Sequence, residues 1–215
     1  MAHSGTGALA HQFDDPAQQL AASSLGMWAF IATEMLFFGG LFASYTVYRL
    51  SYPQAFAAGS GHLDIGLGMV NTAVLISSSL TMALAVFSAR FSSRRSVVLF
   101  LGATLVLGMV FLAIKGVEYV HKFHEHLIPG AAFVFPGAHS RGVEIFFSLY
   151  FAMTGMHALH MVIGAALLTI LTVLAWRGRF SAEYYTPVEM VGLYWHFVDV
   201  IWIFLFPLLY LLGRH

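Results

Sequence analysis

The sequence contains no cysteine and few charged side chains. Without cysteine, disulfide frameworks, thiol catalysis and cysteine-ligated zinc or iron–sulfur sites are excluded. Asp, Glu, Lys and Arg make up 9% of the 215 residues, against roughly a quarter in ordinary soluble domains. Ten basic residues balance ten acidic ones, so the chain lacks the basic excess on which nucleic-acid binding depends.

Hydrophobic residues, by contrast, make up 59% of the chain, and the mean hydropathy is +0.79. A soluble protein of this size could not cover so much apolar side chain with polar surface. The composition therefore excludes a water-soluble enzyme and a disordered tail. It indicates an integral membrane protein.

Five apolar stretches are each long enough to cross a bilayer, which takes about 20 residues of helix. Their residues do not alternate between apolar and polar, as the strands of a membrane barrel would. We therefore expect an all-α fold, with one domain over residues 1–215 that consists of a polar N-terminal arm and five transmembrane helices. The arm covers residues 1–23, and the expected spans cover residues 25–48, 65–87, 97–119, 145–176 and 191–212.

Basic residues beside the spans predict the orientation of the chain, because cytoplasmic loops are enriched in Lys and Arg. The loops after the second and fourth spans hold five clustered arginines: Arg90, Arg94, Arg95, Arg177 and Arg179. The opposite side holds four basic residues: Arg49, Lys122, Arg141 and Arg214. We expect the N-terminus in the cytoplasm and the C-terminus on the outer, periplasmic side. The first residues lack the basic segment of a cleavable signal peptide, so we expect none.

Glu34 lies near the middle of the first expected span, in the string Ala-Thr-Glu-Met-Leu-Phe-Phe. A charge at that depth costs about 2.5–3.5 kcal/mol on insertion scales. Desolvation favours the neutral acid unless water or a partner reaches it. Two interpretations stay open: a carboxyl that exchanges protons or contacts a neighbouring subunit, and a neutral acid that is hydrogen-bonded inside the bundle.

Glu118 ends the third expected span, three residues after Lys115. This spacing places the two side chains on one helix face, where they can pair. We expect an interfacial ion pair that anchors the helix end, or a Lys115 side chain that extends toward the membrane surface. Glu118 and His121 also form a Glu-x-x-His motif, but a di-iron site requires a second copy, which the chain lacks.

Two pairs of polar residues share helix faces within the spans. His157 and His160 stand three apart in the fourth span, as do His196 and Asp199 in the fifth. Imidazole is a common ligand of haem and metal ions. Polar groups inside membrane bundles also hydrogen-bond one helix to another, and we favour this second interpretation.

The longest expected loop, Val120–Gly142, holds the run His121-Lys-Phe-His-Glu-His126. Its three histidines could bind a metal ion at the periphery, but a solvated loop is the simpler interpretation. The chain shows no pairing of a nucleophile with a base and no glycine-rich phosphate loop. The residues alone therefore indicate a membrane subunit that binds neighbours and lipid, rather than a self-sufficient catalyst.

The last span carries the string Trp195-His-Phe-Val-Asp-Val-Ile-Trp202. This string resembles a hallmark of subunit III of the haem–copper oxidases, the cytochrome c oxidase subunit III family. Longer members have seven helices and this chain lacks the first two, so it resembles the short, five-helix form. Four further motifs match in the same order along the chain: Thr33-Glu34-Met-Leu-Phe-Phe, Asn71-Thr72, Glu118-Tyr119, and Gly155-Met-His157-Ala-Leu-His160 with Gly164.

The resemblance implies a subunit of a complex that reduces oxygen to water and pumps protons in a bacterial plasma membrane. Haem and copper are then expected in partner subunits I and II, with no redox centre in this chain. The family's third subunit supports assembly, lipid binding and proton uptake, and Glu34 matches its carbodiimide-reactive carboxyl. The other matched residues are expected to be packing and hydrogen-bond anchors: Glu118, His157, His160, Trp195, His196 and Asp199.

Bound phospholipid and a larger respiratory supercomplex are further expected partners. In longer relatives, basic residues ahead of the corresponding first helix hold lipid phosphates. Residues 20–25 contain none, so we do not transfer that contact. Two alternatives stay open: a subunit-III-like partner of a quinol oxidase or nitric oxide reductase, and a self-contained membrane haem or di-iron protein.

Overall fold

The computed structural model describes residues 12–130, 133–136, 139–182 and 184–212, and no β-strand occurs within them. In these residues, six α-helices are followed by a π-helical turn, η1. Their bounds are α1 Pro16–Ser51, α2 Pro53–Gly61, α3 Ile65–Arg90, α4 Arg94–His124, α5 Ser140–Trp176, α6 Thr186–Phe206 and η1 Pro207–Leu211.

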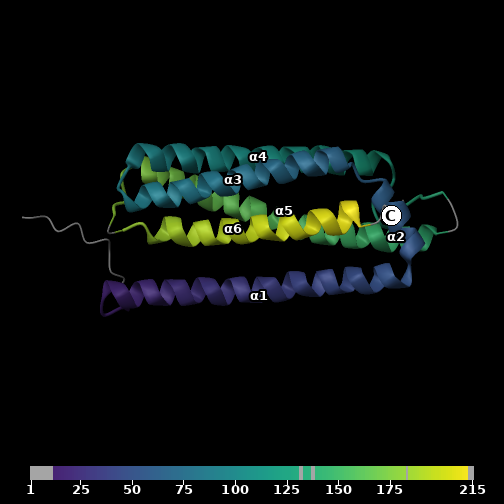
Figure 1. Ribbon diagram of the computed structural model, residues 1–215, viewed down its shortest axis with the longest axis horizontal. Helices are drawn as coiled ribbons and strands as arrows, with labels where there is room; N and C mark the ends of the chain where they lie inside the picture. The colour runs from purple at the N-terminus through teal and green to yellow at the C-terminus, as the bar shows by residue number, and fades with distance from the viewer. Residues whose placement is uncertain (1–11, 131–132, 137–138, 183, 213–215) are drawn as a thin grey trace, which may run out of the picture.

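Five of these helices are long and apolar enough to cross a membrane, and α2 is the short exception. They run side by side along the long axis of the molecule (Figure 1). In this view α1 lies along one edge, α3 and α4 lie along the other, and α5 and α6 lie between them. For the described residues, the expected all-α bundle of five membrane-crossing helices is confirmed.

The connections between the long helices gather at two opposite ends of the bundle. The start of α1 lies at the same end as the α3–α4 and α5–α6 connections (Figure 1). The five clustered arginines of those connections are therefore grouped with the start of α1. The α4–α5 connection and the end of the described chain lie at the other end. This grouping is the one that the basic residues predicted, and the assignment of the arginine end to the cytoplasm stays a prediction.

The first helix begins earlier than we expected from hydrophobicity. Oδ1 of Asp15 accepts a hydrogen bond from the backbone N–H of Gln18 at 2.7 Å, and Pro16 occupies the first helical position. An acidic N-cap followed by proline is a strong start signal. Residues 16–23, which we expected in a polar arm, are consequently the first two turns of α1. Residues 1–11 of that arm lie outside the described residues.

The expected loop over Val120–Gly142 is wrong at its beginning, because α4 continues through His124. Lys122 Nζ lies 2.6 Å from Oε2 of Glu125, and His121 Nε2 lies 3.3 Å from Oε1 of the same residue. Pairs three and four residues apart favour helix, so this polar segment extends the helix past the apolar stretch. At the other end α5 begins at Ser140, two residues before the expected loop ends.

The core lies between α3, α4, α5 and α6. Its largest buried side chains include Trp195 and Trp202 of α6 and Phe111 of α4. By contrast, α1 packs on α5 and α6 and directs many large apolar side chains outward. An outward apolar face is expected where lipid replaces water. It leaves α1 as the helix whose sides are open to lipid or to another subunit.

Candidate functional site

Glu34 of α1 and His160 of α5 form a pair at membrane depth. His160 Nε2 lies 3.2 Å from Oε2 of Glu34, and their side chains are 9% and 22% exposed, respectively. His160 Nδ1 lies 2.8 Å from the carbonyl oxygen of Met156. A carbonyl can only accept, so this contact assigns a proton to Nδ1 and leaves Nε2 of the neutral ring as an acceptor toward Glu34. The pair can share one proton between carboxyl and imidazole.

Aromatic residues hold the imidazole of this pair in place. The ring of Phe38 meets that of His160 edge-on at 5.5 Å between centroids, and the Tyr194 ring stacks at 6.4 Å. The Tyr194 hydroxyl also donates to the carbonyl oxygen of His160 at 2.9 Å. The sequence indicated Glu34 and His160 as separate candidates, and the structure brings them together.

A second polar cluster lies inside the bundle around Lys115 and Glu118. Their side chains are 5% and 3% exposed, and Lys115 Nζ lies 3.0 Å from Oε2 of Glu118. The expected ion pair is therefore present. Lys115 does not extend toward the membrane surface, because α5 and η1 cover the pair with Tyr150 and Tyr210, and the interfacial depth of the pair stays a prediction.

The cluster satisfies its own hydrogen bonds completely. The Lys115 ammonium donates its three hydrogens to Glu118, Tyr150 and Tyr210, at 2.9–3.1 Å. The two tyrosine hydroxyls donate to Oε1 of Glu118 at 2.7 and 2.5 Å. Both charges are thus compensated away from water, which is the condition for a buried ion pair to persist. The sequence showed no signal for the tyrosines, because tyrosine is common in apolar helices.

Charged residues continue along the same face of α4 toward the end of the bundle. Lys115, Glu118, Lys122 and Glu125 follow at spacings of three, four and three residues, with alternating sign. Lys122 is also buried, and its ammonium donates to the carbonyl oxygen of His62 at 2.8 Å. A pocket of about 340 Å³ lies between this row and the start of α3. The ion pairs of this row lead from the partly exposed Glu125 inward to the buried Lys115 and Glu118.

The matched string in α6 contributes two tryptophan anchors. Trp195 Nε1 donates to Ser78 Oγ at 3.0 Å, and Trp202 Nε1 donates to Thr72 Oγ1 at 3.1 Å. A Cβ added at Gly108 would lie 2.7 Å from the Trp195 ring, and one added at Gly164 would lie 2.8 Å from it. Both glycines therefore permit the tryptophan to pack between α4 and α5.

His157 and Asp199 are buried without hydrogen-bond partners among the described residues. The His157 ring packs instead against Phe111 and Trp202, at 5.4 and 5.3 Å between centroids. For these two residues the hydrogen-bond role stays a prediction, whereas His160 and Glu118 do make hydrogen bonds. Within the described ranges, no group of three His, Asp or Glu side chains is placed to hold a metal ion.

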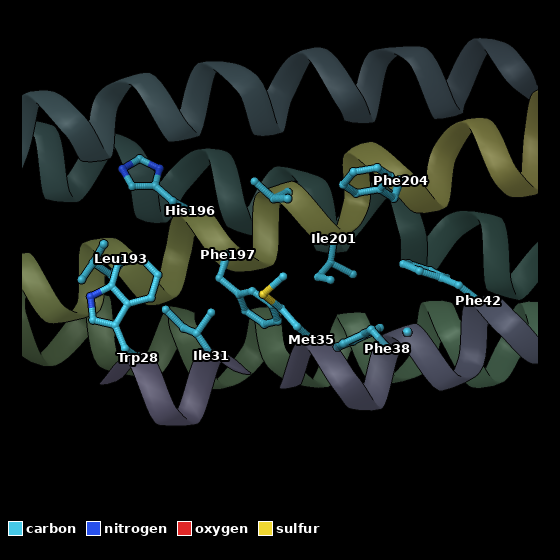
Figure 2. Close-up of a pocket in the computed structure, with 12 residues that line it drawn as sticks. Trp28, Ile31, Met35, Phe38, Phe42, Leu193, His196, Phe197, Ile201 and Phe204 are labelled. Atoms are coloured by element: carbon cyan, nitrogen blue, oxygen red, sulfur yellow. The ribbon is translucent and has the colours of Figure 1, made fainter. Parts of the chain in front are cut away.

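His196 binds Ser79, with its Nδ1 2.7 Å from the serine Oγ. The same imidazole lines an apolar groove of about 430 Å³ between α1 and α6. Figure 2 shows Trp28, Met35 and Phe38 of α1 facing Phe197 and other residues of α6 across this groove. The sequence did not indicate the groove, because its existence depends on how far α1 stands from α6.

Comparisons with known proteins give one consistent result. The family model "Cytochrome c oxidase subunit III" matches residues 17–214. Cytochrome c oxidase subunit 3 of Synechocystis sp. is 37% identical over 191 residues, which cover 87% of this chain and 74% of the relative. Quinol oxidase subunit 3 of Bacillus subtilis is 34% identical over 189 residues, 88% and 86% of the two chains. Cytochrome bo(3) ubiquinol oxidase subunit 3 of Pseudomonas aeruginosa is 28% identical over 203 residues, 94% and 91%.

Proposed function

Because the chain belongs to the cytochrome c oxidase subunit III family, we propose that it is subunit III of a proton-pumping haem–copper terminal oxidase. It carries no redox centre, and the haem and copper are in partner subunits I and II. It supports assembly of the complex and proton uptake by the catalytic subunit, and it binds phospholipid. The complex lies in a bacterial plasma membrane, with the arginine end of this bundle in the cytoplasm.

The observation that carries this proposal is the Glu34–His160 pair. Titratable groups within a membrane span are costly and mark functional sites. This pair lies on α1, the helix with open sides, and Glu34 is still partly exposed there. A catalytic subunit packed against α1 would meet a carboxyl whose proton can be shared with an imidazole. By contrast, the Lys115–Glu118 cluster is buried and hydrogen-bonded within the bundle, where it supports the fold.

Purification through an affinity tag on this chain tests the assignment to an oxidase. We expect a large haem-bearing membrane subunit to co-purify and to show a reduced-minus-oxidised haem spectrum. The tagged chain separated from its partners is expected to be colourless. A Soret band or bound iron in the separated chain would instead support the self-contained haem or di-iron protein.

Labelling with a hydrophobic carbodiimide tests the role of Glu34. We expect labelling of the wild-type chain, loss of that labelling in Glu34→Gln, and unchanged labelling in the control Glu144→Gln. Glu144 is suited as a control because it lies at the end of the bundle, where it accepts from the Gly130 N–H. Labelling that persists in Glu34→Gln would show that a different carboxyl reacts.

The second candidate is subunit III of a quinol oxidase, which the names of two relatives favour. The donor is recognised by partner subunits, so the partner that co-purifies decides between the two. A subunit II with bound copper would indicate a cytochrome c oxidase, and one without copper would indicate a quinol oxidase. A nitric oxide reductase among the co-purified subunits would overturn both.

A further inference from the structure

The groove between α1 and α6 has the composition of a small-molecule site. Its volume of about 430 Å³ lies within the range of roughly 300–1,000 Å³ that is typical of ligand pockets. Aromatic side chains line it from both helices, among them Trp28, Phe38 and Phe197. Such pockets commonly combine an apolar lining with a few polar groups that orient the ligand. Here His196 is the titratable lining residue.

His196 stands near the middle of the last candidate membrane span, Thr186–Leu211. It follows Thr186, the first residue of α6, by ten residues, which corresponds to about 15 Å along a helix axis. The hydrocarbon core of a bilayer is about 30 Å thick. The imidazole therefore offers a hydrogen bond at a depth where lipid tails have no polar atom.

One nitrogen of this imidazole is available to a ligand. Nδ1 is bound to Ser79 Oγ at 2.7 Å, whereas Nε2 has no protein partner among the described residues. In Figure 2 the ring stands on the side of α6 away from α1, at the margin of the groove. A second pocket, of about 330 Å³, adjoins this ring and extends toward Arg90 and Glu189. His196 thus lines both spaces, the apolar groove and a second pocket that also has charged side chains in its lining.

We propose that this groove binds the head group of an isoprenoid quinone, with His196 as the hydrogen-bond partner of a ring oxygen. A quinone combines a flat ring that packs against aromatic side chains, an oxygen that pairs with imidazole, and an apolar tail. The tail would lie along the α1 side of the groove toward Phe204. A phospholipid fits less well, because its polar atoms stay at the membrane surface and leave the imidazole without a partner.

Two adjacent glycines of α1 provide a matched pair of variants. A Cβ added at Gly39 or at Gly40 meets nothing within 4 Å, so neither position restricts side-chain size within this chain. Gly39 lines the groove and Gly40 does not. Gly39→Leu should fill the groove, whereas Gly40→Leu adds the same side chain outside it.

Photolabelling with an azidoquinone tests the proposal in membranes that contain the affinity-tagged full chain. We expect label on peptides from α1 and α6 around the groove, and competition by unlabelled quinone. Gly39→Leu should abolish this labelling and Gly40→Leu should leave it unchanged. His196→Leu should weaken binding about three- to tenfold, the usual effect of losing one hydrogen bond, and His196→Gln should restore most of it. The amount of chain in the membrane, measured for each variant, shows whether it folds.

Four results would overturn the proposal. Label spread evenly over all lipid-facing helices, or displaced as well by phospholipid as by quinone, would mean that ordinary lipid fills the groove. Equal labelling of the Gly39→Leu and Gly40→Leu chains would place the quinone elsewhere. If the groove residues are protected from the photolabel only when other subunits are present, a partner helix covers the groove. Since the label is read on this chain, the outcome does not depend on which oxidase the chain joins.

Discussion

The hydroxyl of Tyr210 donates a hydrogen bond to Oε1 of Glu118 across 2.5 Å and 92 positions of sequence. This contact fastens η1, at the end of the described chain, to α4. It is one of five hydrogen bonds that close the buried cluster around Lys115. The fold is therefore expected to be more sensitive to changes here than at any exposed ion pair.

Removal of one charge from this cluster should destabilise the chain strongly. In Lys115→Met, Glu118 keeps its two tyrosine donors but loses its counter-ion, and breaking a buried pair in this way costs about 3–5 kcal/mol. The double variant Lys115→Met/Glu118→Leu removes both charges and should recover most of that loss. Unfolding of the purified chain in detergent, followed by circular dichroism, measures both. A single variant as stable as the double one would contradict the compensation described here.

Gly108 should not tolerate even one added methyl group. A Cβ at this position would lie 2.7 Å from the ring of Trp195, and overpacking of this kind costs about 1–3 kcal/mol. Gly102 lies on the same helix with nothing within 4 Å of an added Cβ. We expect Gly108→Ala to lower the free energy of unfolding and Gly102→Ala to raise it slightly, because alanine favours helix. Equal effects would mean that Trp195 can shift without cost.

Ser78 and Ser77 should respond differently to the same substitution. Ser78 Oγ accepts from the buried Trp195 Nε1, whereas the exposed Ser77 donates to the carbonyl oxygen of Ala73 in its own helix. Ser78→Ala leaves a buried N–H without its acceptor and should cost about 1–3 kcal/mol. Ser77→Ala should stay within about 0.5 kcal/mol of wild type. Tryptophan fluorescence during unfolding reports both values, and a neutral Ser78→Ala would indicate that the indole finds another partner.

Asp15→Ala should loosen the first turn of α1. The Asp15 side chain caps this helix, and loss of an N-cap costs about 1 kcal/mol. We expect faster amide hydrogen exchange at residues 17–20, with the rest of the helix unchanged. Asp14→Ala is the control, because Asp14 contacts Gln18 through its backbone N–H rather than its side chain. Faster exchange in both variants would show that charge, and not the cap, stabilises the turn.

Much of the fold was predictable because the membrane imposes a simple rule on the sequence. Long apolar runs must be helices, so the five spans were found within a few turns. Their ends were predicted less well, since local signals set them. The Asp15 cap starts α1 inside the expected arm, and the Glu125 ion pairs carry α4 into the expected loop. Hydrophobicity marks the lipid-contacting part of a helix and does not mark where the helix stops.

The residues of the candidate site were predictable from the sequence, but most of the contacts between them were not. Glu34 and His160 were identifiable because polar residues are rare inside apolar runs. Their contact joins α1 to α5, and no spacing in one helix contains that information. Lys115 and Glu118 were paired correctly, since they lie on the same helix. Tyr210 was not foreseen as their partner, because the direction of its side chain depends on the π-helical turn that begins at Pro207.

The position of Tyr210 in the chain also has a consequence for biogenesis. A ribosome delivers α4 to the membrane with Lys115 and Glu118 before it has made either tyrosine that completes their hydrogen bonds. The charges must therefore enter the bilayer with only each other as partners, and Tyr150 and then Tyr210 arrive later in synthesis. The hydrogen bonds of the cluster are thus complete only after η1 and all five spans have been synthesised. A chain that stops before Pro207 would retain its spans and leave the charged pair open, a state that membrane quality control could recognise.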